Sequence, residues 1–362
     1  MTVRYGVDGY RDGVSSEASQ TFTDLDQTFA LSRGQYIEGS SYLNGGVFGE
    51  LDTVFTPWLE AHAGARVGLV GVRAPGDAAS GTGAVSTRYP SVVGGAGVEA
   101  GAGEHLRLFL NWDQGFRAPN LDDLTSRQQT GPGFQFENPD LSPERTNTFE
   151  LGFALDTGLL RFEGWGFATL LDDAIIRSVR DADDCPPGAP ECSASRNQYQ
   201  LVNADGASTI LGAEGGATVY LPADVTLRAT VSYAWGEAPN TGGRPGDPTF
   251  GVERVPLSRI PPLNGTVEAR WRHLATGIYA AGALRWAADQ ARLAPSDFSD
   301  ARIPIGGTPG YAVLDLRAGV RWSRHVRLSL VFENVADTAY RMHGSSVNGP
   351  GRGLMAELML GL

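Results

Sequence analysis

Apolar and polar residues alternate with a period of two along almost the whole chain. The segment 225–235 is an example, with Leu227 and Val231 in its apolar set. Arg228 and Ser232 belong to the polar set between them. Successive side chains of a β-strand point to opposite faces, so such a segment has one apolar face and one polar face. Helical periodicity is scarce, and the sequence therefore predicts an all-β chain.

About fourteen segments alternate in this way. Most are 10 to 14 residues long, about twice the usual strand of a soluble protein. A tilted strand needs roughly 9–11 residues to cross a bilayer, so these segments are long enough to span one. They are predicted near residues 2–12, 42–56, 58–72, 89–101, 104–117, 146–157, 160–170, 207–221, 224–236, 262–272, 276–288, 311–323, 325–334 and 351–362.

Short and long connections alternate between these segments. The short ones lie at Thr56–Pro57, Gly101–Gly103, Asp156–Gly158, Pro222–Ala223, His273–Ala275 and Ser323–Arg324. The long ones cover residues 13–41, 73–88, 118–145, 171–206, 237–261, 289–310 and 335–350. Short turns on one side and long loops on the other are the layout of an outer-membrane barrel. Long loops are also unusual inside a compact soluble domain.

Tryptophan placement agrees with a membrane-spanning sheet, because amphipathic rings gather at the two membrane interfaces. Only Trp165 is expected in mid-strand. A soluble β-sandwich is the alternative, since it would also alternate apolar and polar positions. The long strands and the one-sided long loops favour an antiparallel transmembrane β-barrel. The tryptophans expected near strand ends are Trp58, Trp112, Trp235, Trp271, Trp286 and Trp322.

Composition narrows the class further. Of the 362 residues, 41% are hydrophobic, which is too many for a disordered chain. No stretch reaches the roughly 18 unbroken apolar residues that a transmembrane helix needs. The net charge is −12. Nucleic acid is therefore not expected as a partner, because phosphate binding depends on clustered Lys and Arg.

The two cysteines, Cys185 and Cys192, lie in a polar segment rich in proline and aspartate. Two cysteines are too few for a structural zinc site. Their spacing closes a small loop, which favours a disulfide in an oxidising compartment, and two unrelated free thiols are the alternative. Acidic residues flank the pair and form either a solvated loop tip or a contact for a cationic ligand. These are Asp181, Asp183, Asp184 and Glu191.

Three groups of residues follow one another in the chain. The first is Phe116, Arg117, Ala118 and Pro119. The second is Asn138, Pro139, Leu141, Pro143 and Glu144. The third is Glu333, Asn334, Tyr340, Arg341, Gly351 and Arg352. Pro119 is expected to end a strand because it has no N–H to donate. Pro139 and Pro143 preset φ for turns. Arg117 and Glu150 are expected to point into a watery lumen.

In this order, the three groups resemble the FRAP box, the NPxLxPE segment and the terminal box of TonB-dependent outer-membrane receptors. Tyr311 to Leu316, preceded by Pro309 and Gly310, also resemble the antepenultimate strand of this family. The resemblance covers residues 111–362, and the first hundred residues are compatible with it. It implies the C-terminal part of a receptor β-barrel, with about 14 strands present of a probable 22.

Receptors of this family begin with a signal peptide, a short energy-coupling box and a globular plug. The N-terminus here, MTVRYGVDGY, has neither a basic n-region nor an apolar h-region. Residues 1–362 are therefore expected to be the C-terminal part of such a barrel, with no plug domain and no signal peptide. Counting back from a periplasmic C-terminus puts every long loop outside the cell.

The resemblance implies an outer-membrane receptor for TonB-coupled uptake of a scarce, bulky nutrient. Its expected partners are outer-membrane lipid, an extracellular small-molecule ligand, and the TonB energy-coupling complex through a missing N-terminal region. Haem receptors of the family place a histidine between the first two motifs, and residues 120–137 contain none. A ferric siderophore or cobalamin is therefore favoured over haem. The sequence predicts no bound cofactor.

Two rival functions stay open. A self-closing passive channel is possible, because 14 strands is an even number within the bacterial range. An outer-membrane hydrolase would need a nucleophile and a base in hydrogen-bond reach. The histidines are scattered without metal-ligand spacing, so the chain is not expected to be an enzyme. They are His62, His105, His273, His325 and His343.

Overall fold

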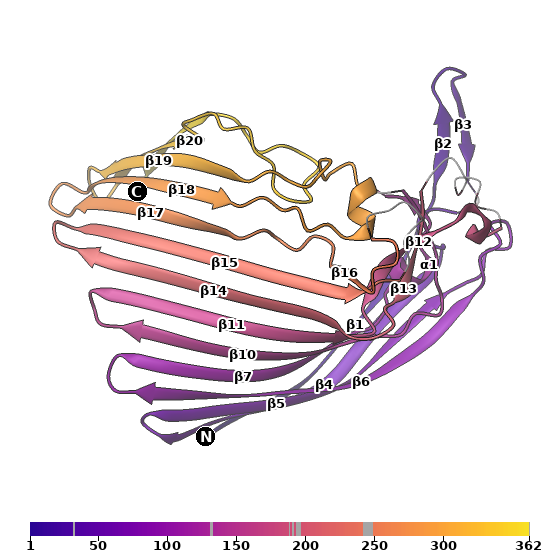
Figure 1. Ribbon diagram of the computed structural model, residues 1–362, viewed down its shortest axis with the longest axis horizontal. Helices are drawn as coiled ribbons and strands as arrows, with labels where there is room; N and C mark the ends of the chain where they lie inside the picture. Colours follow the sequence, from indigo (N-terminus) through magenta and orange to yellow (C-terminus); the bar gives the residue numbers. More distant parts are fainter. Residues whose placement is uncertain are drawn as a thin grey trace.

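The computed structural model describes residues 1–31, 33–130, 133–187, 189, 192, 197–241 and 249–361. Within these residues, long antiparallel strands form one sheet in which each pairs with the next long strand along the chain (Figure 1). In sheet order they are β1 (Thr2–Val14), β4 (Ser40–Thr56), β5 (Leu59–Ala74), β6 (Val85–Ala102), β7 (Leu106–Arg117), β10 (Glu144–Asp156), β11 (Leu160–Asp172), β14 (Ser208–Leu221), β15 (Val225–Pro239), β17 (Asn264–His273), β18 (Ile278–Ala287), β19 (Tyr311–Arg321), β20 (Val326–Glu333) and β21 (Gly353–Leu360).

All fourteen predicted strands are confirmed, and no predicted boundary differs from the observed one by more than four residues. Turns of two to four residues join the strands at one end of the sheet. The long connections gather at the other end (Figure 1). Both chain ends lie on the side of the short turns, because β1 starts there and β21 ends there. No helix in the described part of the chain is long and apolar enough to cross a membrane.

The two faces of the sheet differ in chemistry. The inner face carries paired charges, such as Arg4 of β1 opposite Glu50 of β4, whose Nε and Oε2 atoms lie 3.0 Å apart. The outer face carries exposed apolar side chains, including Val7, Val47, Val67, Val92, Leu110 and Leu151. One charged, wet face and one apolar face are the surfaces of a transmembrane β-barrel wall.

The sheet is open at its two edge strands, β1 and β21. In the described part of the chain, β1 pairs only with β4, and β21 pairs only with β20. The short strand β16 (Arg254–Pro256) adds to the loop end of β15. The fold class is therefore the predicted antiparallel β-barrel, represented here by one continuous wall of neighbouring hairpins.

The long connections contain elements that the alternation did not predict, because each is too short to show a period. A helix, α1 (Leu121–Thr125), follows β7, and β2 (Ser19–Phe22) forms a hairpin with β3 (Gln27–Ala30). A second sheet joins two separate connections in the order β12 (Ile175–Arg180), β13 (Gln198–Asn203), β9 (Phe134–Phe136) and β8 (Gln128–Gln129). Its β13–β9 pairing is parallel. The 3₁₀ turns are η1 (Ala182–Asp184) and η2 (Pro295–Ser299).

A small apolar core lies at the loop end of the sheet. Its buried side chains include Leu124, Val72 and Leu141, which come from α1, β5 and the connection before β10. The rest of the sheet has little buried apolar area, as expected for a wall whose outer side chains face lipid. The core therefore holds the long connections together and positions the motif residues.

Trp112 departs from the predicted placement, whereas Trp165 agrees with it. Trp112 lies in the middle of β7, paired with Ala96 and Phe149, and not near a strand end. The alternation locates this strand, β7, but does not give the position of Trp112 within it. Trp165 lies in mid-strand as predicted, and its ring packs 5.0 Å from that of Phe109 on the inner face. Trp58, Trp271 and Trp322 lie exposed at the short-turn end.

Candidate functional site

The first two motifs meet around Arg117, the last residue of β7. Its Nη1 donates to Asp123 Oδ2 at 2.7 Å, and its Nε donates to Glu144 at the start of β10. Asp123 also accepts a hydrogen bond from the Asn120 backbone N–H at 3.0 Å and so caps α1. The second oxygen of Glu144 accepts from the Ile175 N–H at 2.7 Å. One guanidinium therefore ties together two barrel strands, α1 and β12.

The apolar members of these motifs pack beneath that arginine. Ala118 and Leu141 are buried in the core, and Pro119 is fully buried. The Tyr89 hydroxyl donates to the Leu141 carbonyl at 3.0 Å, which links β6 to the second motif. Phe116 lies at the loop end of β7 with the Arg145 guanidinium 5.5 Å from its ring centre. These residues therefore form a structural corner between β7 and β10.

Asn138 fixes the turn that leads back to the barrel. Its Oδ1 accepts from the Asp140 N–H at 3.1 Å across Pro139, and its Nδ2 donates to the Leu201 carbonyl at 2.8 Å. An Asx turn of this kind is typical of Asn before a turn. Pro143 directly precedes β10. The prolines lie at the turn positions that the sequence predicts for them.

Two partly buried arginines, Arg127 and Arg33, connect the long loops, and sequence patterns gave no signal for either. The Arg127 guanidinium pairs with Glu137, with its Nε 2.6 Å from Glu137 Oε2, and it also donates to the Ser80 carbonyl at 2.9 Å. Arg33 donates to Thr82 Oγ1 at 3.0 Å and to the Gln35 carbonyl at 2.8 Å. Burial lowers the pKa of the Arg33 guanidinium. Only the folded loops bring these partners together.

The third motif builds a second corner around the buried side chain of Asn334. Its Nδ2 donates to the Thr338 and Pro350 carbonyls at 2.9 and 3.0 Å, and its Oδ1 accepts from the Thr338 N–H at 2.8 Å. Its backbone N–H donates to Asp315 Oδ1 at 2.9 Å. Asn334 has φ +46°, a left-handed conformation that Asn tolerates better than most residues. The amide therefore closes the turn after β20.

Asp315 connects this corner to the neighbouring strand. Its Oδ2 accepts from Arg285 Nε at 2.9 Å, and the Arg285 guanidinium lies 5.9 Å from the centre of the Tyr340 ring. Gly349 passes so close that an added Cβ would lie 2.0 Å from Tyr340 Cζ. Tyr340 is therefore fixed by charge on one side and by backbone on the other.

The remaining members of the third motif lie on the rim of the same corner. Arg352 Nη2 lies 3.3 Å from Asp337 Oδ2, and Arg341 Nε donates to Asn348 Oδ1 at 2.8 Å. Gly351 lies beside Asp337, whose Oδ1 would be 3.0 Å from an added Cβ. Glu333, the last residue of β20, pairs with Gly353. The motif as a whole joins β18, β19, β20 and β21 at the loop end.

Cys185 and Cys192 are joined by a disulfide, with their Cα atoms 5.7 Å apart. Cys192 packs against Phe134 and Phe136 of β9, so the disulfide lies against the small second sheet. Asp181, Asp183 and Asp184 are exposed, and the Asp181 N–H donates to Asp184 Oδ2 at 2.9 Å. Glu191, the fourth acidic residue of the predicted cluster, lies outside the described residues.

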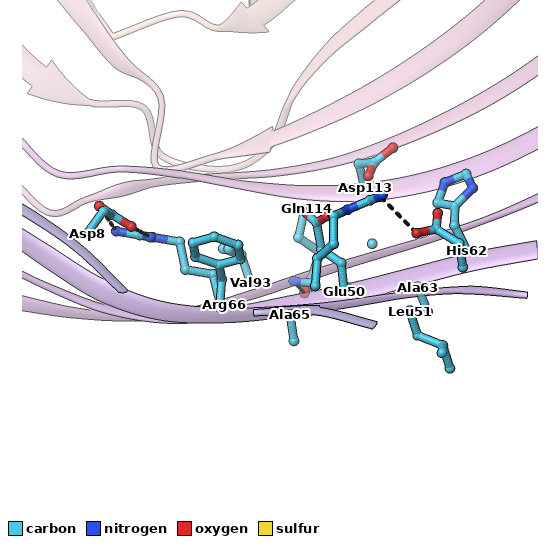
Figure 2. Close-up of a pocket in the computed structure, with 16 residues that line it drawn as sticks. Asp8, Glu50, Leu51, His62, Ala63, Ala65, Arg66, Val93, Asp113 and Gln114 are labelled. Atoms are coloured by element: carbon cyan, nitrogen blue, oxygen red, sulfur yellow. Dashed lines mark hydrogen bonds and ion pairs between the residues drawn. The ribbon is translucent and has the colours of Figure 1, made fainter. Parts of the chain in front are cut away.

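A groove of about 530 Å³ opens on the inner face and is lined by β1, β4, β5, β6 and β7 (Figure 2). Arg4 Nη2 lies 2.8 Å from Asp52 Oδ2, and Arg66 pairs with Asp8. Figure 2 shows His62 and Asp113 on the same side of the sheet, while Leu51 points to the opposite side. The groove offers charges of both signs to a polar ligand or to the polar surface of another protein segment.

The five histidines are distributed over the sheet and its connections. His105 and His273 lie at short turns, where their Nδ1 atoms contact the Asp156 carbonyl and Thr276 Oγ1. His343 lies at the opposite end, 2.9 Å from Thr308 Oγ1. Across the described ranges, no group of three or more His, Cys, Asp or Glu side chains is arranged to hold a metal ion.

Comparison with known proteins agrees with this arrangement. The family model described as "TonB dependent receptor-like, beta-barrel" matches residues 2–335. The iron-regulated outer membrane virulence protein of Vibrio cholerae serotype O1 is 34% identical over 136 residues, which cover 36% of this chain and 20% of that protein. The chain belongs to the TonB-dependent receptor family, and the matched region is the β-barrel of that family.

Solved structures share the fold. The copper transporter OprC matches with a TM-score of 0.77 at 20% identity, covering 99% of this chain and 54% of that one. The hemophore receptor HasR of Serratia marcescens, solved with its hemophore HasA and heme, matches with a TM-score of 0.72 at 16% identity, covering 99% and 55%. This chain therefore spans about half the length of the solved relatives. Both names describe transport or reception, and neither describes an enzyme.

Proposed function

We propose that this chain forms the wall of an outer-membrane receptor that takes up a scarce, bulky nutrient by TonB-coupled transport. In this proposal, residues 1–362 are the C-terminal part of the barrel, the long loops lie outside the cell and the C-terminus lies in the periplasm. The energy-coupling complex acts through a region outside this chain. Family membership and the length share of the solved relatives support the proposal.

The observation that carries the proposal is the difference between the two ends of the sheet and between its two faces. Packed loops lie at one end, short turns lie at the other, and charged residues follow the inner face between them. A ligand bound by the loops would reach the periplasmic side along the inner face, where ion pairs such as Arg66–Asp8 provide polar contacts. The apolar outer face would keep the wall in lipid.

A ferric siderophore is the favoured ligand, and cobalamin is the second candidate. The description of the Vibrio cholerae relative as iron-regulated supports iron over other cargo. The solved relatives also include an iron transporter of Neisseria meningitidis and a ferric enterobactin receptor of Pseudomonas aeruginosa. The absence of histidine from residues 120–137 still disfavours haem.

Nutrient uptake by the bacterium that carries the gene tests this function directly. Cells that lack the gene should lose energy-dependent uptake of a radiolabelled ferric siderophore, measured beside labelled cobalamin and haemin. Arg66→Gln should lower that uptake because it removes an inner-face ion pair, while Arg324→Gln at a short turn should not. Uptake that persists without TonB, together with steady conductance of the purified protein in planar bilayers, would instead support a passive channel.

A further inference from the structure

Three arginines lie on the outer, lipid-facing side of the sheet at its loop end. Arg11 pairs with Leu43, Leu43 pairs with Gly71, and Gly71 pairs with Arg88, so Arg11 and Arg88 share one row across four neighbouring strands. Arg73 lies two residues from Gly71 along β5 and is therefore diagonal to Arg88. Diagonal positions on one face lie about 7–8 Å apart. We call these three residues the outer arginine cluster.

The cluster lies directly above an apolar band. Four residues toward the short turns along each of the same strands, the outer face carries Val7, Leu69 and Val92, all exposed. Four strand residues span about 13 Å. The guanidinium groups are therefore at the height where a hydrocarbon-facing surface ends and polar lipid headgroups begin.

The three arginines have no internal counter-charge. All three side chains are exposed, and within the described residues none of them forms a hydrogen bond, ion pair or ring contact. The outward positions of β1, β4, β5 and β6 contain no carboxylate. This contrasts with the inner face of the same strands, where Arg4 and Arg66 are each paired with acidic side chains.

We infer that the outer arginine cluster binds the phosphate groups of a phosphorylated glycolipid in the outer leaflet of the outer membrane. Guanidinium groups bind phosphate bidentately, and basic clusters beside a membrane-spanning surface bind lipid headgroups. The spread of the cluster over three strand spacings, about 14 Å, suits a headgroup with more than one phosphate. The inference rests on the proposed orientation, in which the loop end faces outward.

Native mass spectrometry of the complete receptor that contains this chain, purified in mild detergent from the outer membrane of the bacterium that makes it, tests the inference. The wild type should retain bisphosphorylated lipid A. Arg11→Gln, Arg73→Gln and Arg88→Gln together should weaken its binding by about a hundredfold, at about 1 kcal/mol for each arginine near a charged lipid surface. The matched control removes three other arginines, Arg228→Gln, Arg272→Gln and Arg327→Gln, and should bind within about twofold of the wild type.

Further measurements distinguish lipid phosphate from inorganic phosphate. They also keep a failure of this inference distinguishable from a failure of the proposed function. Dephosphorylated lipid A should bind the wild type and the outer triple variant equally, and inorganic phosphate should not compete at matched concentration. Equal retention of bisphosphorylated lipid by the wild type and the outer triple variant, or full competition by inorganic phosphate, would overturn the inference. Surface labelling of intact cells at Leu25→Cys in the exposed β2–β3 hairpin reports the orientation independently. Lipid retention is read without any nutrient, so a failure of uptake leaves this test intact.

Discussion

Asn334 is a buried residue whose side chain and backbone together close the turn after β20. Its amide makes three hydrogen bonds, and its backbone N–H binds the carboxylate of Asp315. That carboxylate also accepts from Arg285, so the Asn334 backbone N–H supports the geometry of an ion pair on the neighbouring strands. A family motif residue of this kind acts here through packing and hydrogen bonds.

Asn334→Ala should therefore lower the free energy of unfolding by about 3 kcal/mol, because it removes three side-chain hydrogen bonds, to Thr338 and Pro350, at about 1 kcal/mol each. Urea unfolding of the membrane-extracted protein, followed by tryptophan fluorescence, measures the loss. Asn348→Ala, at an exposed position of the same connection, should cost less than about 1 kcal/mol. Equal losses for the two variants would contradict the role assigned to Asn334.

His343 gives the loop end a dependence on pH. Burial holds the pKa of its imidazole below the ordinary 6.5, Arg259 acts in the same direction, and Asp297 and Asp300 oppose it. Between the lowered value and 6.5, the unfolded chain binds a proton that the folded chain does not. The stability from neutral His343 is therefore complete above about pH 6.5 and is lost as the pH falls.

His343→Gln should flatten this dependence, since glutamine can still bond to Thr308 but does not titrate. Thermal unfolding midpoints at about pH 7.5 and about pH 5 measure the pH dependence of stability. The midpoint of the wild type should fall more between these two pH values than the midpoint of the variant. His273→Gln at an exposed short turn serves as the control and should keep the wild-type slope. A variant slope equal to that of the wild type would exclude His343 as the source.

At the scale of elements, the sequence predicts the long strands but not the short elements in the connections. Each strand repeats its two-residue period for eight or more residues, so alternation located all fourteen within four residues. The connections contain β8 and β9, of two and three residues, which are too short for any period. The contacts of Arg117 with Glu144 and of Arg127 with Glu137 depend on how separate segments meet. The motif residues could be found from the sequence, but their shared corner could not.

The disulfide loop is an element whose state in solution can be measured. The bridge closes a segment with a sequence separation of 7, and removing it should cost about 2.5 kcal/mol through the greater freedom of the unfolded chain. Alkylation of the unfolded protein by a maleimide–polyethylene glycol reagent should add mass only after reduction. Cys185→Ser with Cys192→Ser is the blank. Equal labelling with and without reductant would show two free thiols.

At the scale of the whole molecule, the two edge strands of the sheet limit its stability in a membrane. β1 and β21 each leave one row of backbone N–H and C=O groups without a strand partner in the described part of the chain. Lipid offers no hydrogen bonds, so an open edge is costly within the hydrocarbon region. The wall therefore requires further strands, or direct pairing of its own two ends, before it is stable in a bilayer.

The 362-residue chain by itself should accordingly fail to insert into lipid vesicles as a heat-modifiable monomer. Refolding from urea into vesicles, followed by gels of boiled and unboiled samples, is the measurement. A full-length receptor of the same family refolded in parallel controls for the lipid and the procedure. A monomer band that shifts on boiling would show that the chain closes without help and would favour the passive channel.

The order of the long strands has a consequence for how such a wall can change in evolution. In the part of the chain that the structure describes, every long strand pairs with the next long strand in the sequence. Gain or loss of one complete hairpin would leave every other pairing and the inside-outside alternation unaltered. Circumference can then vary in steps of two strands, in agreement with the even strand numbers of bacterial barrels.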